Sequence, residues 1–285
     1  MLLSRNQGRR SDGDALEWLR RSASWRRLAA PQADLYDVEV VLTAAAMRAS
    51  APVPSRSAAS PIAIELIYPD SELRAVAGDD FVDAEPSHPS IAEATDLLAA
   101  WPAGREHVER LIRRLHPAVD VRRPRVLPAT TIVSASHSSE RRFGTLWAAV
   151  NSPVGLAQSI VHELAHHKLR ALGLSAGDAR AIVANDPGDL FPSPLVAWPR
   201  PMSAVVHAHY ALLHVLALDV ALFASADVAR DALARSAATH AAKLDQSARV
   251  IRRHAIVDAV GVSFMEGMWE WMESVLSQAV RHGLV

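Results

Sequence analysis

The stretch "SIVHELAHHKL" at residues 159–169 contains the pattern His-Glu-x-x-His, formed by His162, Glu163 and His166. On a helix, residues four apart lie on one face with Cβ atoms about 6 Å apart, so both imidazoles can bind one metal ion. Glu163 lies about 100° further round the helix, where its carboxylate can act on a metal-bound water or orient a substrate group. The spacing predicts a metal site with Glu163 as a catalytic residue, and the adjacent His167 is expected on the surface.

Two histidines do not hold a catalytic ion, so a third ligand is required. The chain has no cysteine, and it has no glutamate between Glu163 and Glu266, which removes the downstream glutamate of thermolysin-like zinc peptidases. The segment "VVHAHYALLH" at 205–214 is the richest remaining source of ligands, and we choose His207. The alternatives that stay open are His214, Asp186 and Asp189.

A helix with clear boundaries must carry the motif. Ser152 is a candidate N-cap, Pro153 fits the first helical position, and Gly173 is well placed to end the helix. Before it, the runs at 130–136 and 144–150 read as two strands of a hairpin. The sequence therefore predicts a strand pair directly before the metal-site helix.

The other elements are mainly helical. Apolar helices are predicted over about 202–223, 226–254 and 262–283, and two more between 91 and 115, separated at "WPAGRE". A further strand is expected at 62–69, after a loop rich in Pro and Ser. Together these patterns predict an α+β fold that is predominantly α, with a small antiparallel sheet.

The first part of the chain has a basic amphipathic helix at 12–30, followed by a second helix at 34–48. We expect residues 1–120 to form a mainly helical N-terminal region and residues 121–285 to form the metal-site domain. The basic face is either a solvated helix surface or a docking surface for an acidic peptide. Its cations are Arg20, Arg21, Arg26 and Arg27.

The composition narrows the class of protein. The 285 residues are 50% hydrophobic and carry a net charge of −1, which supports a buried core and argues against a nucleic-acid-coating or membrane-surface role. The apolar run at 210–223 is interrupted by His214 and Asp219 and is short for a membrane span. We therefore expect a soluble, cytoplasmic protein with no nucleic-acid or membrane partner.

The segment "SIVHELAHHKLRAL", followed after a Pro-rich stretch by "LVAWPRPMSAVVHAHYALLHV", resembles bacterial His-Glu-x-x-His proteins of peptide natural-product pathways. Some members of that family are iron- and 2-oxoglutarate-dependent peptide β-hydroxylases. The likeness covers roughly residues 125–280, and its specific part is the pairing of the two segments.

The resemblance implies an Fe(II) ion held by His162, His166 and a downstream residue that we place at His207. A three-histidine site departs from the common set of two histidines and one carboxylate, which keeps Glu163 as an alternative ligand. The co-substrate 2-oxoglutarate would bind iron through its keto acid end. Arg200 has the bidentate geometry to hold its distal carboxylate.

The expected function is β-hydroxylation of a side chain in a ribosomally made precursor peptide. The alternative is a zinc metallopeptidase in which Glu163 acts as the general base on metal-bound water. A non-catalytic peptide-binding protein is the third class. Iron content, 2-oxoglutarate consumption and peptide cleavage distinguish the three.

Overall fold

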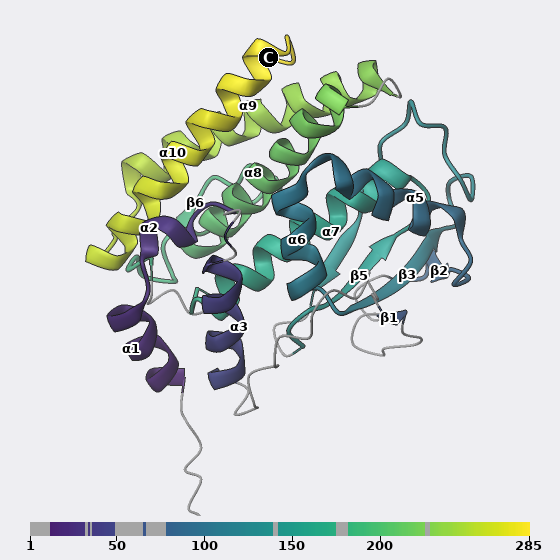
Figure 1. The fold of residues 1–285 in the computed structure, drawn as a ribbon. Coiled ribbons are helices and arrows are strands. Elements are labelled where there is room, and N and C mark those ends of the chain that lie inside the picture. The colour runs from purple at the N-terminus through teal and green to yellow at the C-terminus, as the bar shows by residue number, and fades with distance from the viewer. Residues whose placement is uncertain are drawn as a thin grey trace, which may run out of the picture.

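The computed structural model describes residues 12–31, 34, 36–48, 65–66, 78–138, 142–174, 182–225 and 229–285 (Figure 1). Its helices are α1 (Asp12–Ser22), α2 (Trp25–Leu28), α3 (Tyr36–Arg48), α5 (Pro89–Leu97), the 3-10 turn η1 (Leu98–Ala100), α6 (Pro102–Leu111), α7 (Pro153–Ala171), α8 (Met202–Ser225), α9 (Arg230–His254) and α10 (Ala259–Arg281). Its strands are β1 (Glu65–Leu66), β2 (Phe81–Asp83), β3 (Arg114–Asp120), β4 (Ser136–Ser138), β5 (Thr145–Ala149), β6 (Leu190–Phe191) and β7 (Arg200–Pro201). The predominantly helical α+β class is confirmed.

Helix α7, which carries the His-Glu-x-x-His motif, begins and ends where the sequence predicts. The Ser152 hydroxyl accepts a hydrogen bond of 3.1 Å from the backbone N–H of Gly155, which satisfies one of the free donors of the first turn. Pro153 opens the helix, and Gly173 follows it with φ +93°, in the left-handed region that glycine adopts without strain. Local signals alone therefore place α7.

The main sheet is mixed, so the predicted antiparallel sheet was wrong in this respect. β3 pairs parallel with both β1 and β5, whereas β2 pairs antiparallel with β3, and β4 antiparallel with β5. The sequence reading missed β3 because its middle residue is Pro117, and proline argues against a central strand. The hairpin of β4 and β5 was predicted, but β4 has only Ser136–Ser138 in strand conformation.

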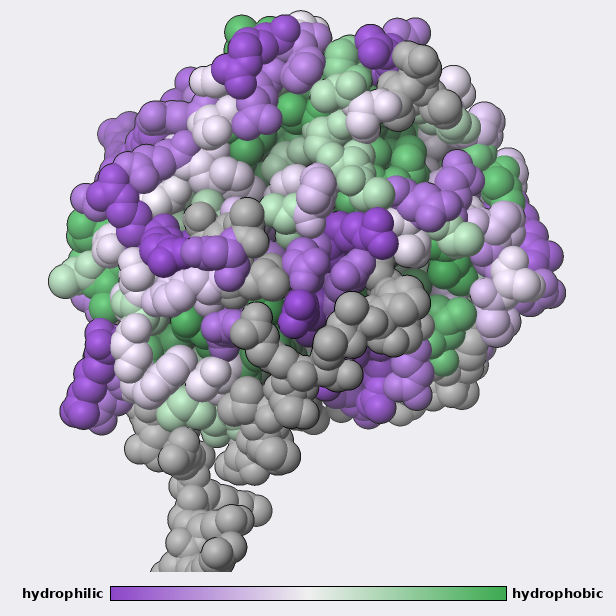
Figure 2. All heavy atoms as spheres, viewed as in Figure 1, coloured by the Kyte–Doolittle hydropathy of each residue, from purple (hydrophilic) through white to green (hydrophobic). Residues whose placement is uncertain are grey.

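The central helix of the fold is α8, which packs against α7, α9 and α10 (Figure 1). It is long and apolar enough to cross a membrane by length and composition, yet 94% of its most apolar window is buried inside the protein. The outer helices cover it, and the face seen in Figure 2 is a mosaic of hydrophilic and hydrophobic residues. The hydrophobicity of α8 is thus accounted for by burial in the core.

The basic face of the N-terminal helices contacts the chain itself. Arg20 pairs with Asp258 at 3.2 Å, and Arg26 pairs with Glu270 and lies 3.6 Å from Glu266, all on or next to α10. Arg21 and Arg27 also have acidic partners within the chain, Glu17 and Asp34. Each arginine of the predicted basic face therefore forms an ion pair within the chain. Exposed ion pairs of this kind contribute little to stability individually.

The expected division after residue 120 falls inside the sheet. β3 ends at Asp120, and its residues Arg114–Ala118 pair with Thr145–Ala149 of β5, in the second part. One continuous group of buried apolar side chains runs from Leu19 to Leu284. The N-terminal helices and the metal-site helix thus share a core. The predicted loop at 50–61 and most of the strand predicted at 62–69 lie outside the described residues.

Candidate metal centre and adjoining cleft

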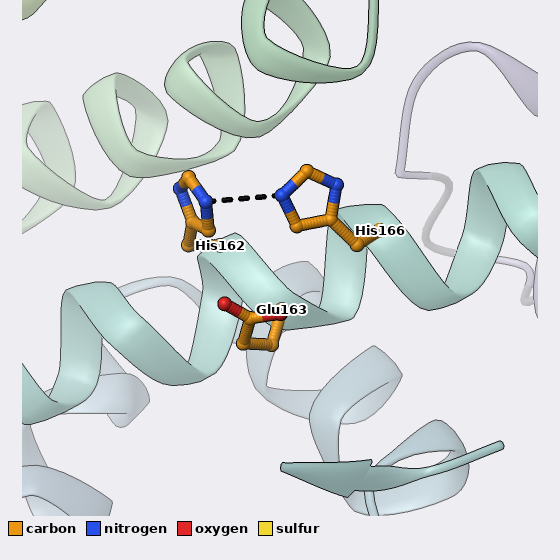
Figure 3. A group of neighbouring side chains, drawn as sticks. All are labelled: His162, Glu163 and His166. Atoms are coloured by element: carbon orange, nitrogen blue, oxygen red, sulfur yellow. Dashed lines mark hydrogen bonds between the residues drawn. The ribbon is translucent and has the colours of Figure 1, made fainter. Parts of the chain in front are cut away.

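The two motif histidines lie side by side on α7. The Nε2 atoms of His162 and His166 are 3.1 Å apart, and both rings leave the same side of the helix (Figure 3). Two nitrogen ligands at about 2.0–2.1 Å from one tetrahedral ion are separated by about 3.3 Å. The imidazole pair is therefore already spaced for a shared metal ion.

Both imidazoles are held in the neutral form, which is the form that binds metals. Burial lowers the pKa of His162, and burial together with the charges of neighbouring histidines holds the pKa of His166 well below its usual range. A neutral ring keeps one nitrogen lone pair free near neutral pH. The donor atoms thus suit a divalent ion without prior loss of a proton.

Glu163 completes a group of three side chains that could hold a metal ion. One donor atom from each of His162, Glu163 and His166 lies within 4.8 Å of the other two. The Glu163 side chain leaves α7 on a different side from the rings (Figure 3) and is 2% exposed. The Ser136 hydroxyl donates to its Oε1 at 2.8 Å, and the Ser138 hydroxyl donates to its Oε2.

These hydrogen bonds tie helix α7 to strand β4. Arg170 in turn donates to the Ser138 hydroxyl at 2.8 Å. Both oxygens of Glu163 are engaged, although a carboxylate with about four acceptor sites retains capacity for a metal. The carboxylate is therefore positioned and restrained by the sheet.

His207 contacts His166 from the opposite side. The two Nδ1 atoms are 3.0 Å apart, and the His207 Nε2 lies 2.6 Å from the carbonyl oxygen of Leu174. A carbonyl oxygen only accepts, so Nε2 of His207 carries the hydrogen. Burial lowers the pKa of His207 to about 4, so its neutral Nδ1 accepts a hydrogen bond from Nδ1 of His166.

This chain of hydrogen bonds sets the tautomer of His166. With its hydrogen on Nδ1, His166 presents the Nε2 lone pair to the side where His162 lies. A histidine that binds a metal commonly donates its other ring N–H to a neighbouring acceptor in this way. For His166, that acceptor is Nδ1 of His207. Ligation of the same ion by His207 would require the His166 ring to turn, and it stays a prediction.

Among the described residues, the group of side chains placed to share one ion does not include the other residues considered in the sequence. His214 donates from Nδ1 to the Tyr210 carbonyl, and the exposed Asp186 accepts from the backbone of Gly188. Asp189 is also exposed, and Arg200 lies on β7, opposite Phe191. The structure brings together His162, Glu163, His166 and His207.

The expectation that His167 lies on the surface was wrong. His167 is 1% exposed, and its Nε2 donates to the Thr145 carbonyl oxygen at 3.1 Å. Burial lowers its pKa to about 4. Because α7 is covered by the sheet on one side and by α8 on another, residues on several of its faces are buried. His167 links α7 to β5.

A pocket of about 310 Å³ opens beside His162. We call it the α9 pocket; its walls include Ser136 of β4, Ser159 and His162 of α7, and His240 and Lys243 of α9. A second pocket of about 390 Å³ shares Gln158, Ser134 and His240 with it, so the two pockets adjoin, and together we call them the cleft.

Sequence reasoning missed the polar network at this cleft. Asp219, fully buried on α8, accepts from His240 Nδ1 at 2.9 Å, from Gln158 at 2.6 Å and from Ser236 at 3.0 Å. The carboxylate fixes the hydrogen on Nδ1 of His240. Ser236, His240 and Lys243 recur at i, i+4 and i+7, and this polar stripe on a helix was the available signal.

No protein-family model matches the chain, and no curated protein matches it in sequence. The assignment of a function therefore depends on the residues of the site and on the resemblance of its two segments.

Proposed function

We propose that the protein is an Fe(II)- and 2-oxoglutarate-dependent enzyme that hydroxylates a side chain of a ribosomally made precursor peptide in the cytoplasm. The observation that carries this proposal is the group formed by His162, Glu163 and His166, whose donor atoms lie within 4.8 Å of one another. Two histidines and one carboxylate are the ligand set typical of non-haem iron oxygenases.

The chain's own residues supply binding and orientation. His162 and His166 would hold the ion, and Glu163 is the carboxylate nearest to them, restrained by Ser136 and Ser138. When iron and 2-oxoglutarate are bound, dioxygen places one oxygen atom in the peptide and one in succinate, with release of carbon dioxide. The two adjoining pockets beside His162, of about 310 and 390 Å³, have the volume to take a co-substrate and a side chain of a peptide.

The alternative is a zinc metallopeptidase, favoured by the position of Glu163 next to the histidine pair. A general base needs a carboxylate oxygen free to take a proton from metal-bound water. Both oxygens of Glu163 accept hydrogen bonds from serines of β4. The lone pairs that remain on these oxygens can take a proton as well as bind a metal, so the hydrogen bonds are compatible with either role. We place hydrolysis second because the chain has no glutamate between Glu163 and Glu266 to act as the third zinc ligand of a thermolysin-like peptidase.

The deciding experiment compares the wild-type protein with Glu163→Gln. Protein loaded with Fe(II) under anaerobic conditions is mixed with 2-oxoglutarate, air-saturated buffer and candidate precursor peptides. Oxygen uptake, succinate formation and peptide mass are measured. We expect 2-oxoglutarate-dependent uptake and a peptide heavier by one oxygen atom. If Glu163 is a ligand, the variant should bind iron more weakly, because a neutral amide is a poorer ligand than a carboxylate.

A hydrolase gives the opposite pattern. The zinc-loaded wild type should cleave a peptide, and Glu163→Gln should retain zinc yet lose nearly all turnover. Ser225→Ala, at the exposed end of α8, serves as a control because its hydroxyl donates to the backbone of Ala221 and not to Glu163. Absence of oxygen uptake by the iron-loaded wild type with its peptide present would reject the hydroxylase.

A further inference from the structure

The described lining of the α9 pocket is rich in hydrogen-bond donors and contains no acidic residue. Among these described wall residues, Lys243 is the only one with a formal charge, and it is accompanied by His162 and His240. Among the residues that the structure describes, no carboxylate pairs with the Lys243 ammonium group. An uncompensated cation in a concave site attracts an anion, and the field is strengthened by the low dielectric of the walls.

A buried hydroxyl points to a ligand atom in the same pocket. Ser159 is 1% exposed, and no protein group within the described part of the chain makes a hydrogen bond with its Oγ. Ser159 lies three residues before His162 on α7, so both face the pocket from one side of the helix. A buried hydroxyl without a partner is costly, so an oxygen atom of a ligand is the partner that this position suits.

The opposite wall is built to hold Lys243 in place. Asp219 bonds to Gln158 of α7 and to His240 of α9, so it fixes these two helices relative to each other. Lys243 follows His240 by three residues and therefore shares its face of α9. By fixing His240, the network orders the turn of α9 that carries Lys243, and the ammonium group itself is not part of the network.

We propose that the α9 pocket binds the carboxylate of an organic acid, with the Lys243 ammonium group as the counter-charge and the Ser159 hydroxyl as a hydrogen-bond donor. A single cation matches the single charge of a carboxylate. Since His162 lines the same pocket, the acid lies beside the metal ligands. Its identity as the distal carboxylate of 2-oxoglutarate rests on the proposed function and places that carboxylate at Lys243 instead of Arg200.

The test measures binding without turnover. Zinc-loaded protein, which cannot support oxygen chemistry, and metal-free protein are titrated with succinate and with 2-oxoglutarate by isothermal titration calorimetry. Lys243→Gln should weaken binding about 10- to 100-fold, as expected for loss of a charge-assisted hydrogen bond. Lys243→Arg should retain most of the affinity. Ser159→Ala should weaken binding by a smaller factor.

The matched control is Arg249→Gln, which removes one positive charge from an exposed position of the same helix. Arg249 pairs with Asp245 and does not line the pocket. The control should bind both acids like the wild type. Urea denaturation of each variant, followed by tryptophan fluorescence, separates a local effect from a loss of folding.

The outcomes are distinct. Binding that depends on Lys243 supports the proposal even if oxygen uptake is never observed, in which case only the proposed function fails. If succinate does not bind but a peptide with glutamate side chains does, and only with Lys243 intact, the carboxylate comes from the peptide. Equal binding by Lys243→Gln, or a loss confined to Arg200→Ala, would overturn the proposal, as would a wild type that binds neither ligand.

Discussion

Replacing Asp37 by asparagine should destabilise the fold more than any exposed charge change. Asp37 on α3 accepts a hydrogen bond of 2.8 Å from Lys168 on α7, and both side chains are fully buried. His107 of α6 lies 3.2 Å from the other carboxylate oxygen. The variant keeps the shape of the side chain but leaves the Lys168 ammonium group without its counter-charge.

The size of the effect follows from burial. Two unit charges about 4 Å apart attract by about 4 kcal/mol at an effective dielectric constant of 20. Breaking a buried pair by removing one partner costs about 3–5 kcal/mol, because the remaining charge cannot be hydrated. Asp37→Asn should therefore lower the free energy of unfolding by that amount and Tm by roughly 10 °C.

The dependence on pH has a defined sign. Burial alone would raise the pKa of Asp37, but the attraction of Lys168 and the contact with His107 outweigh it and hold this pKa well below its usual range. A lowered carboxyl pKa contributes stability above about pH 4 that is lost as the pH falls through the folded-state value. The difference between wild type and variant should thus be constant between about pH 5 and 8 and shrink in stronger acid.

Urea denaturation followed by tryptophan fluorescence measures both quantities. Asp245→Asn, at an exposed pair with Arg249, is the control and should cost less than about 1 kcal/mol. The double variant Asp37→Leu/Lys168→Met, which removes both charges, should recover most of the loss. A loss below about 1 kcal/mol in Asp37→Asn would refute the reasoning that this pair is held in a dry interior.

Two further outcomes are expected. A Cβ added at Gly155 would lie 1.9 Å from the Val133 carbonyl oxygen, so Gly155→Ala should lower the free energy of unfolding by about 2 kcal/mol or more. The control Gly188→Ala, whose Cβ would meet only a side-chain oxygen at 3.2 Å, should change this free energy little. Urea denaturation curves that give both variants equal stability would contradict this packing. Hydrogen bonds from Arg122 lower the pKa of Asp120 to about 2, so Asp120→Asn should reduce the free energy of unfolding at neutral pH. The difference between variant and wild type should disappear as the pH falls to about 2. A difference in unfolding free energy that persists at that pH would contradict this assignment.

Local patterns predicted helix α7 and the shared face of its two motif histidines. The N-cap at Ser152, the terminating Gly173 and the i, i+4 spacing of His162 and His166 act within one helix, so they needed no information from the rest of the chain. The long helices after Met202 were predicted for the same reason. Parallel pairing of β3 was missed, because it joins strands distant in sequence and passes through a proline.

The surroundings of the histidine pair were decided by the tertiary structure. Which of the downstream polar residues approaches α7 depends on how α8 and α9 pack, and this packing brings His207 to the far side of His166 and Asp219 to His240. The buried pair of Asp37 and Lys168 joins residues 131 positions apart. Composition and spacing specify one face of a helix, whereas the partner of that face depends on side chains that meet only after the chain has folded.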